Sequence, residues 1–329
     1  MLEAPLKNLR ISHARYDAAM SALRDAINLA GAQGTCIPLL GPTRVGKTDL
    51  IEAICNELVT ESAGPGYMLP TPDLIQGFIR PKPNDAEIYA AITRAMGARV
   101  APNTKLAVLQ DRVQELIYQR GIKFIVLDEC SHCAEPGANL TRRAAADHIK
   151  TVIDQSGAVV ILAGLPKFER LIDQNEQLSA RSMASIYMLP YRWSDQEDRQ
   201  EFVAVTHSIF DHLEDVGIEL EFDPLDMTRR LYAATGGRVG LVVELIEAAL
   251  KGRLTLEVLS RQDLQKGAST RLQTSSDMPA IFAPEVPQDT VLARSYAMVM
   301  RDAGLRLPNP NSANELHAFQ QAEDEVTAA

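Results

Sequence analysis

The sequence has 329 residues, of which 46% are hydrophobic and 23% charged, the ordinary balance of a globular protein with a buried core. Its net charge of −10 argues against a broadly basic nucleic-acid coat, although it does not exclude a local basic stripe. No apolar run approaches the roughly 20 residues of a membrane span, and the N-terminus lacks the order of a secretion signal, so we expect a cytoplasmic protein without a membrane partner.

The first predicted element is an amphipathic helix over residues 12–29, followed by a short β-rich run at 35–40. A helix just upstream of a phosphate-binding loop often covers a nucleotide base. His13, Arg15 and Tyr16 therefore either line an adenine pocket or pack into the core.

A phosphate-binding loop directly follows the run at 35–40, since the next residues fit G-x-x-x-x-G-K-[ST] and a helical pattern comes after them. Glycines let the backbone curl so that successive N–H groups point at phosphate oxygens, and the helix N-terminus adds positive potential. Lys47 would reach the β- and γ-phosphates, and the Thr48 hydroxyl would bind Mg²⁺. The nucleotide-binding candidates are Gly41, Pro42, Thr43, Arg44, Val45, Gly46, Lys47 and Thr48.

The segment from 70 to 83 contains four prolines, which exclude a regular helix and predict a surface loop. Helical patterns follow over 84–97 and 103–119. These elements connect the phosphate loop to the next buried strand.

That strand is predicted at 124–127 and ends on Asp128 and Glu129, so its carboxyl end points acids at a ligand. Asp128 is the expected Mg²⁺ ligand, and Glu129 is placed to polarise the water that attacks the γ-phosphate. The plainer alternative is an acid pair that caps a helix. A second buried strand ends at Ala163 and Gly164, which offer no polar side chain to orient the water.

Four cysteines include a C-x-x-C pair, Cys130 and Cys133, with His132 between them. No second pair follows at finger-like spacing, so reduced thiols are favoured over a zinc site.

A helix over 166–174 and a last strand over 184–189 complete the predicted α/β core. Arg181, just before that strand, is expected to project from the subunit edge and complete a neighbour's ATP site, or else to form a surface ion pair. Beyond residue 192 the strand pattern stops and helices follow. Arg238, after two glycines, could touch the γ-phosphate from this helical lid.

The composition changes again near Ser269, and the remainder is proline-containing and acidic. We expect an α/β nucleotide-binding core with a doubly wound parallel sheet over 1–192, a helical lid over 193–268 and a partly disordered tail over 269–329, with one helix at 288–303.

The order of these motifs resembles that of an AAA+ ATPase. The residues within the motifs are similar to those of the TniB/TnsC family of transposition ATPases, over about residues 5–265. The similarity is carried by the phosphate loop, Asp128 to His132, Asn175 to Arg181, Leu189 to Trp193 and Thr235 to Leu241. The resemblance implies ATP and Mg²⁺ as cofactors and ATP-dependent assembly into rings or filaments on double-stranded DNA. It also implies a transposase and a targeting factor as partners, with hydrolysis timing disassembly.

A filament can bind DNA without reading its sequence by presenting a few basic groups to the phosphates. The candidates are Arg142, Arg143 and Lys150, with a solvated basic face as the alternative for each. Two other functions fit the nucleotide motifs: a loader or initiator ATPase of another AAA+ class, and a nucleotide-gated scaffold that barely hydrolyses ATP.

Overall fold

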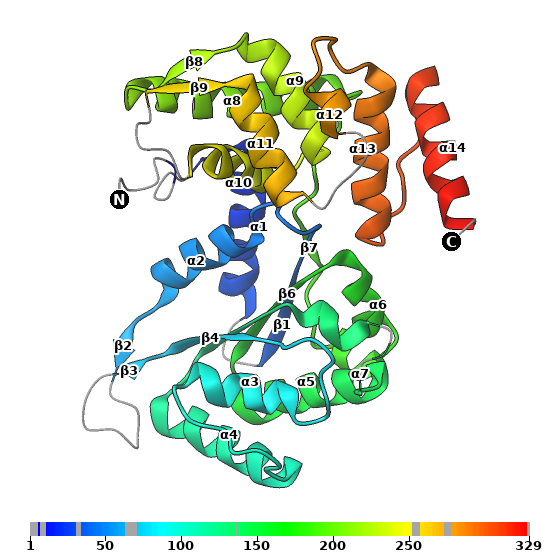
Figure 1. Cartoon of the computed structure of the whole chain (residues 1–329). Helices are drawn as coiled ribbons and strands as arrows, with labels where there is room; N and C mark the ends of the chain where they lie inside the picture. Colours follow the sequence, from blue (N-terminus) through cyan, green and yellow to red (C-terminus); the bar gives the residue numbers. More distant parts are fainter. Residues whose placement is uncertain are drawn as a thin grey trace. The chain divides into compact units, whose positions relative to one another are not determined.

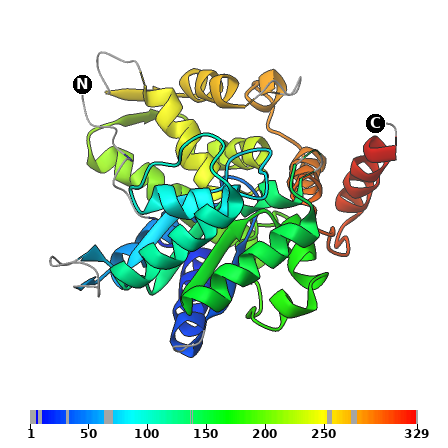
Figure 2. The same cartoon turned by 90° about the horizontal axis from the view of Figure 1, so that it is seen from below.

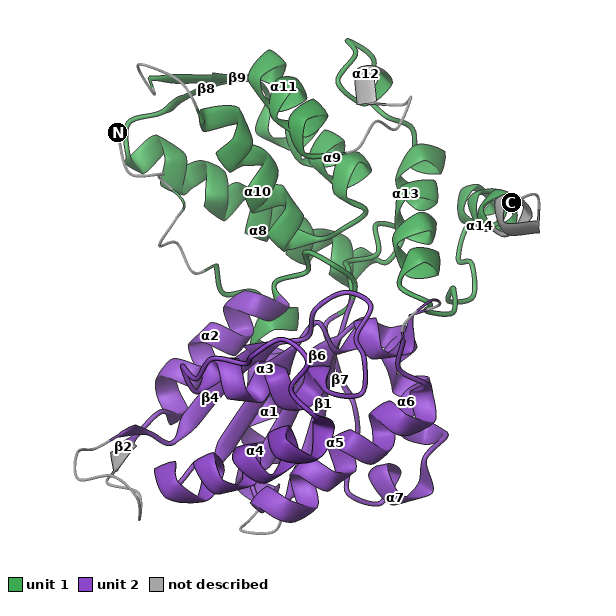
Figure 3. Ribbon diagram, turned by 60° about the horizontal axis from the view of Figure 1, so that its bottom comes forward, with its two compact units in different colours: residues 1–17, 42–46, 189–329 green, residues 18–41, 47–188 purple. Residues whose placement is uncertain are grey.

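The structure is a computed structural model, and it describes residues 6, 11–30, 34–62, 71–135, 137, 139–251, 257–272 and 278–327. Two compact units make up the chain (Figure 3). Unit 1 comprises residues 1–17, 42–46 and 189–329, and unit 2 comprises residues 18–41 and 47–188.

Unit 2 is built on a five-stranded parallel sheet in the order β4-β5-β6-β1-β7 (Figure 1). Its strands are β1 (Thr35–Leu40), β4 (Leu74–Phe78), β5 (Phe124–Asp128), β6 (Val159–Gly164) and β7 (Ile186–Tyr187). All the strands run the same way, so their carboxyl ends share one edge of the sheet, where ligands bind in open α/β folds. The predicted α/β class is confirmed.

The sheet is buried on both faces. Leu127 and Leu162 belong to an apolar cluster on one face, while Leu39, Val126 and Ile161 alternate with such residues and are fully buried on the other. Burial on both sides is the reason that these strands read in the sequence as unbroken apolar runs.

One helix precedes the first strand, and further helices follow and connect the strands. They are α1 (Ala14–Ala30), α2 (Lys47–Leu58), α3 (Glu87–Ala95), α4 (Leu106–Arg120), α5 (Arg142–Ser156), α6 (Glu169–Asp173) and α7 (Glu176–Ser179), with 3₁₀ turns η1 (Cys130–Ala134) and η2 (Pro166–Phe168). Gly121 and Gly157 end α4 and α5 in the left-handed conformation, at φ of 64° and 63°. Within the described part of the chain, no helix is both long and apolar enough to cross a bilayer.

The surface loop predicted over 70–83 is wrong for most of its length. Residues 71–72 form β3, which pairs antiparallel with β2 (Glu61–Ser62), and residues 74–78 form the edge strand β4. Pro72 and Pro81 flank β4 but do not interrupt it, and an edge strand tolerates a neighbouring proline. The prolines on either side mask the short strand between them in the sequence.

Unit 1 is mainly helical. Its elements are α8 (Gln196–Asp215), α9 (Pro224–Thr235), α10 (Val239–Leu250), α11 (Arg261–Arg271), α12 (Met278–Ile281), α13 (Asp289–Asp302) and α14 (Ala313–Thr327), with strands β8 (Glu219–Glu221) and β9 (Val258–Ser260). Phe202, Leu231 and Leu245 lie in one core with Leu6 from the start of the chain.

Strands do occur after residue 192, contrary to the prediction. β8 and β9 pair in parallel and lie side by side in both views (Figures 1 and 2). Three residues are too few to show the alternation by which a strand is recognised in a sequence.

The region after Ser269 is more ordered than predicted. The helix expected at 288–303 is present as α13, and α14 packs beside it (Figures 1 and 2). Tyr296 and Met300 of α13 form a small apolar cluster with Phe319 of α14. Arg230, fully buried on α9, donates hydrogen bonds to the carbonyls of Ile281, Ala283 and Pro284. These bonds hold the segment before α13 against α9. An extended tail would remove these three carbonyl acceptors and leave the guanidinium with Asp226 of its own helix, 2.8 Å from Nε.

Candidate functional site

The phosphate loop lies between β1 and α2, at the carboxyl edge of the sheet. Arg44 and Gly46 both adopt left-handed φ, 63° and 107°, which curls the backbone sharply before α2 begins at Lys47. The Lys47 ammonium donates a hydrogen bond of 2.8 Å to the Gly41 carbonyl, across the mouth of the loop. Thr48 follows in the first turn of α2 with its side chain exposed.

Asp128 and Glu129 meet Lys47 at this edge. Asp128 ends β5 and is only 4% exposed, and its Oδ1 accepts a hydrogen bond of 2.7 Å from the Glu129 amide. Burial raises the pKa of Asp128. Burial also lowers the pKa of Lys47 to about 8, against the attraction of the Asp128 and Glu129 charges. Glu129 has φ of 58° and an exposed side chain. One amine and two carboxylates therefore gather where a phosphate and a divalent ion would bind.

The carboxyl end of β6 lies next to Asp128 and carries no polar side chain. Leu162 pairs with Leu127, so Ala163 and Gly164 continue beside Asp128. Ser131 of η1 lies against this end of β6: it is fully buried, and its Oγ accepts a hydrogen bond from the Leu165 amide. A Cβ at position 164 would lie 2.6 Å from that Oγ, which explains the glycine.

Sequence reasoning missed Ser131. Ser131 reaches the end of β6 because η1 folds against that strand, and no local sequence pattern signals that contact.

The Cys130 and Cys133 thiols are buried. Cys130 Sγ donates a hydrogen bond of 3.1 Å to the Leu127 carbonyl, and burial raises the pKa of Cys133 to about 12. His132 instead pairs with Glu135 at 2.9 Å. Among the described residues, no three His, Cys, Asp or Glu side chains are grouped to bind a metal ion.

Arg181 lies at the opposite edge of the sheet. Its carbonyl accepts a hydrogen bond of 2.8 Å from the Cys36 amide, near the amino end of β1. The six residues of β1 place this edge roughly 17 Å from the phosphate loop. The Arg181 guanidinium pairs with Asp154 and donates to the Gln177 carbonyl at 2.8 Å. Arg181 therefore cannot reach the phosphate loop of its own subunit.

Arg238 lies in unit 1 at the start of α10, where its Nε donates a hydrogen bond of 2.7 Å to the Thr235 carbonyl. Burial, together with the charge of Arg44, lowers the pKa of Arg238 to about 10. The two preceding glycines pack closely against Tyr191, Ser295 and Val299. A Cβ on Gly237 would lie 2.1 Å from the Tyr191 carbonyl oxygen.

The three DNA candidates lie on α5. Arg142 and Arg143 are exposed in its first turn, while Lys150 is half-buried and 3.6 Å from Asp154. At 100° per residue, Arg143 and Lys150 share a helix face with Asp147 and Asp154. The structure therefore places these cations on a face of mixed charge.

His13 and Arg15 pack against the start of the helical unit. His13 Nδ1 lies 2.8 Å from the Tyr191 hydroxyl, and the Arg15 guanidinium lies 4.8 Å from the centre of the Tyr191 ring. Burial lowers the pKa of His13 to about 4, which keeps the ring neutral. These contacts correspond to the core-packing alternative.

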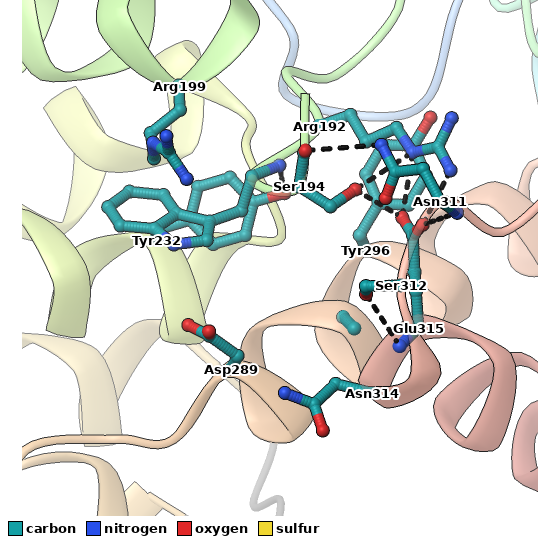
Figure 4. A pocket seen from close by; sticks show the side chains of 12 residues that line it. Arg192, Ser194, Arg199, Tyr232, Asp289, Tyr296, Asn311, Ser312, Asn314 and Glu315 are labelled. Atoms are coloured by element: carbon teal, nitrogen blue, oxygen red, sulfur yellow. Dashed lines mark hydrogen bonds and ion pairs between the residues drawn. The ribbon is translucent and has the colours of Figure 1, made fainter. Parts of the chain in front are cut away.

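A pocket of about 180 Å³ in unit 1 is lined by residues 192–194 and by residues of α8, α9, α13 and the start of α14 (Figure 4). Glu315, 1% exposed, accepts hydrogen bonds from Arg192, from Ser194 at 2.6 Å and from the Asn311 amide at 2.9 Å. Burial alone would raise the pKa of Glu315, but these hydrogen bonds outweigh it and the pKa falls. This network holds the start of α14 against residues 192–194, the segment that precedes α8.

The sheet order, the phosphate loop after β1 and the acidic end of β5 define the AAA+ fold of the phosphate-loop NTPases. A family model described as bacterial TniB protein matches residues 7–189, more than half of the chain. The chain belongs to the TniB family, which confirms the resemblance predicted from its motifs. No curated protein matches the sequence.

Solved structures similar to this chain include ORC and Cdc6 proteins. The Aeropyrum pernix ORC1 protein in complex with DNA has a TM-score of 0.58 at 18% identity, covering 99% of this chain and 81% of that one. The Pyrobaculum aerophilum Cdc6p has a TM-score of 0.56 at 13% identity, with 99% and 90% covered. The Aeropyrum pernix ORC2 protein in its ADPNP–ADP complexes has a TM-score of 0.54 at 15% identity, with 98% and 83% covered. At these identities the likeness establishes the AAA+ fold.

Proposed function

We propose that this TniB-family protein is an ATPase that regulates DNA transposition. It assembles with ATP on double-stranded target DNA, recruits or activates a transposase with a targeting factor, and disassembles on hydrolysis. The observation that carries the ATPase proposal is the meeting of Lys47, Asp128 and Glu129 at the curled phosphate loop. Membership of the TniB family supports the transposition role, and the DNA complex of the similar ORC1 protein is compatible with DNA as a partner.

In this proposal each residue at the carboxyl edge has a separate task. The backbone N–H groups of 42–46 surround the β- and γ-phosphates, and Lys47 leaves the Gly41 carbonyl to neutralise them. The Thr48 hydroxyl and the Asp128 carboxylate supply oxygen ligands of the type that Mg²⁺ prefers, and the ion would neutralise charge on the phosphates. Glu129, exposed beside Asp128, orients and polarises the attacking water.

Arg181 is proposed to act on the ATP of a neighbouring subunit. Its position at the amino edge excludes action within its own subunit and is compatible with an arginine finger supplied in trans. Hydrolysis in this proposal depends on assembly, because only a neighbour supplies the finger. Arg238, which shares unit 1 with loop residues 42–46, is the proposed contact to the γ-phosphate.

Negative-stain imaging of protein, duplex DNA and a non-hydrolysable ATP analogue tests the proposal. Filaments or rings on DNA of unrelated sequences are expected with the analogue and not with ADP. Lys47→Ala should abolish them. Protein that stays unassembled under every condition would refute the assembly role.

A nucleotide-gated scaffold with slow hydrolysis is the second candidate, since the end of β6 offers no polar side chain to orient water. It predicts assemblies that persist in ATP for as long as they do in the analogue.

A further inference from the structure

The first turn of α10 contacts the crest of the phosphate loop, backbone against backbone. The Leu241 amide donates a hydrogen bond of 3.0 Å to the Arg44 carbonyl. A Cβ at position 240 would lie 2.7 Å from that carbonyl oxygen and 3.1 Å from the Gly46 amide nitrogen. Only glycine fits at position 240, because the atoms in its way belong to the main chain and cannot rotate aside.

A carboxylate on the same helix faces the Arg44 guanidinium of the loop. Glu244 Oε2 lies 3.5 Å from Arg44 Nε, with the two side chains 33% and 37% exposed. The Glu244 charge also acts on Arg238, whose pKa it raises against the opposing effects of burial and of Arg44. Asp302 of α13 acts on Arg238 in the same direction. A phosphate arriving at Arg44 therefore meets a guanidinium that already has a counter-ion.

We infer that α10 controls phosphate binding at the loop, with Gly240 fixing the shape of the loop and Glu244 limiting its positive charge. The inference rests on the proposed function in taking a nucleotide polyphosphate as the ligand. Glu244 and the phosphate compete for Arg44, so Glu244 weakens nucleotide binding and favours release. Loop residues 42–46 belong to the same compact unit as α10, so a displacement of the helix reaches the loop through the Leu241 hydrogen bond.

The affinity of the full chain for a fluorescent ADP analogue at low salt is the direct test. Glu244→Gln should tighten binding by about two- to fivefold, the effect of one partly exposed charge. The gain should shrink as salt rises, because screening weakens the repulsion that was removed. The matched control is Glu247→Gln, which changes a glutamate about one turn further along α10 and should leave the affinity unchanged.

A double-mutant cycle shows whether Glu244 acts through Arg44. In an Arg44→Ala background, Glu244→Gln should lose most of its effect. Equal affinities of the wild type and Glu244→Gln at low salt, or equal gains from Glu247→Gln, would overturn the inference. A wild type that binds no ADP would instead refute the proposed function.

Gly240→Ala tests the shape of the loop separately. Main-chain crowding should weaken ADP binding by about five- to a hundredfold, the factor that corresponds to the usual free-energy cost of overpacking. Circular dichroism and the melting temperature check that the variant folds; if it does not, Glu244→Gln still decides the charge half of the inference. A folded Gly240→Ala variant with unchanged affinity would refute control of the loop's shape.

Discussion

The two edges of the parallel sheet hold their charges in different ways. At the carboxyl edge, Lys47 and Asp128 are buried deeply enough for both pKa values to shift toward the neutral forms. At the amino edge, Arg181, Asp154 and Lys150 form ion pairs whose side chains are about a third exposed. The first group is poorly hydrated, while the second remains in contact with water.

This difference separates two tasks. Interactions in a poorly hydrated site are strong, so a charged ligand at the carboxyl edge would be held firmly. Partly exposed ion pairs contribute only about 0–1 kcal/mol, so Arg181 can exchange Asp154 for another anion at small cost. One edge suits a tightly held ligand, and the other suits a contact that forms and breaks between subunits.

The largest expected effect comes from removing Arg181 at the amino edge. Arg181→Ala should lower kcat for ATP in assembled protein by about 10³-fold or more, the range of arginine fingers, and leave the affinity of isolated subunits for ATP unchanged. Steady-state hydrolysis with DNA and binding without it measure the two quantities. Arg170→Ala, an exposed arginine of α6, is the control. Equal rates for Arg181→Ala and the wild type would remove Arg181 from the site.

The next effect belongs to the carboxyl edge. Glu129→Gln keeps the shape of the side chain but removes its ability to accept a proton, so hydrolysis should fall by about 10²- to 10⁴-fold. Assemblies formed in ATP should then persist, as followed by light scattering. Rapid disassembly of this variant would show that hydrolysis does not time release.

The Glu315 carboxylate, buried and paired with Arg192, is a third kind of charge beside those of the two edges. Glu315→Gln leaves Arg192 without its counter-ion and should destabilise the docking of α14 by about 3–5 kcal/mol. In the Glu315→Gln variant, hydrogen exchange in α14 should be faster than in the wild type, while exchange in α10 serves as the internal reference. Because the pKa of Glu315 is lowered in the folded state, acidification through that pKa should loosen α14 in the wild type as well. Glu197→Gln, a change at an exposed residue of α8, should alter neither the hydrogen exchange of α14 nor its response to acid.

The pKa of Lys47 predicts how nucleotide affinity depends on pH. The amine is charged below about pH 8 and neutral above it, so affinity should fall as pH rises from 7 to 9, by up to about tenfold per unit above 8. Lys47→Arg stays charged and should give a flatter profile, provided that it binds. A wild-type profile as flat as that of the variant would contradict the role of Lys47.

The smallest effect should come from Asp154→Asn. Freeing Arg181 from its carboxylate should change ATP hydrolysis by less than about fivefold, since a partly exposed pair is weak. A loss approaching that of Arg181→Ala would mean that Asp154 positions the guanidinium.

The sequence predicts most of the α/β unit and little of the contacts that arrange it. The phosphate loop and Asp128 are recognisable because consecutive residues carry their pattern and buried strands read as apolar runs. β4 escapes because flanking prolines dominate its segment, and β8 and β9 escape because they are short. The contacts of Ser131 and Glu244 depend on residues far apart in the chain, which no local period encodes.

Unit 1 is assembled from three separate stretches, residues 1–17, 42–46 and 189–329. Leu6 lies in a core with helices that follow nearly 200 residues later, and His13 contacts Tyr191. During synthesis the first stretch must therefore wait for the last before its apolar groups are covered, whereas unit 2 can close as soon as residue 188 has left the ribosome. A fragment that begins at residue 193 would lack both Leu6 and Tyr191, so residues 193–329 alone should fold poorly however well their own helices form.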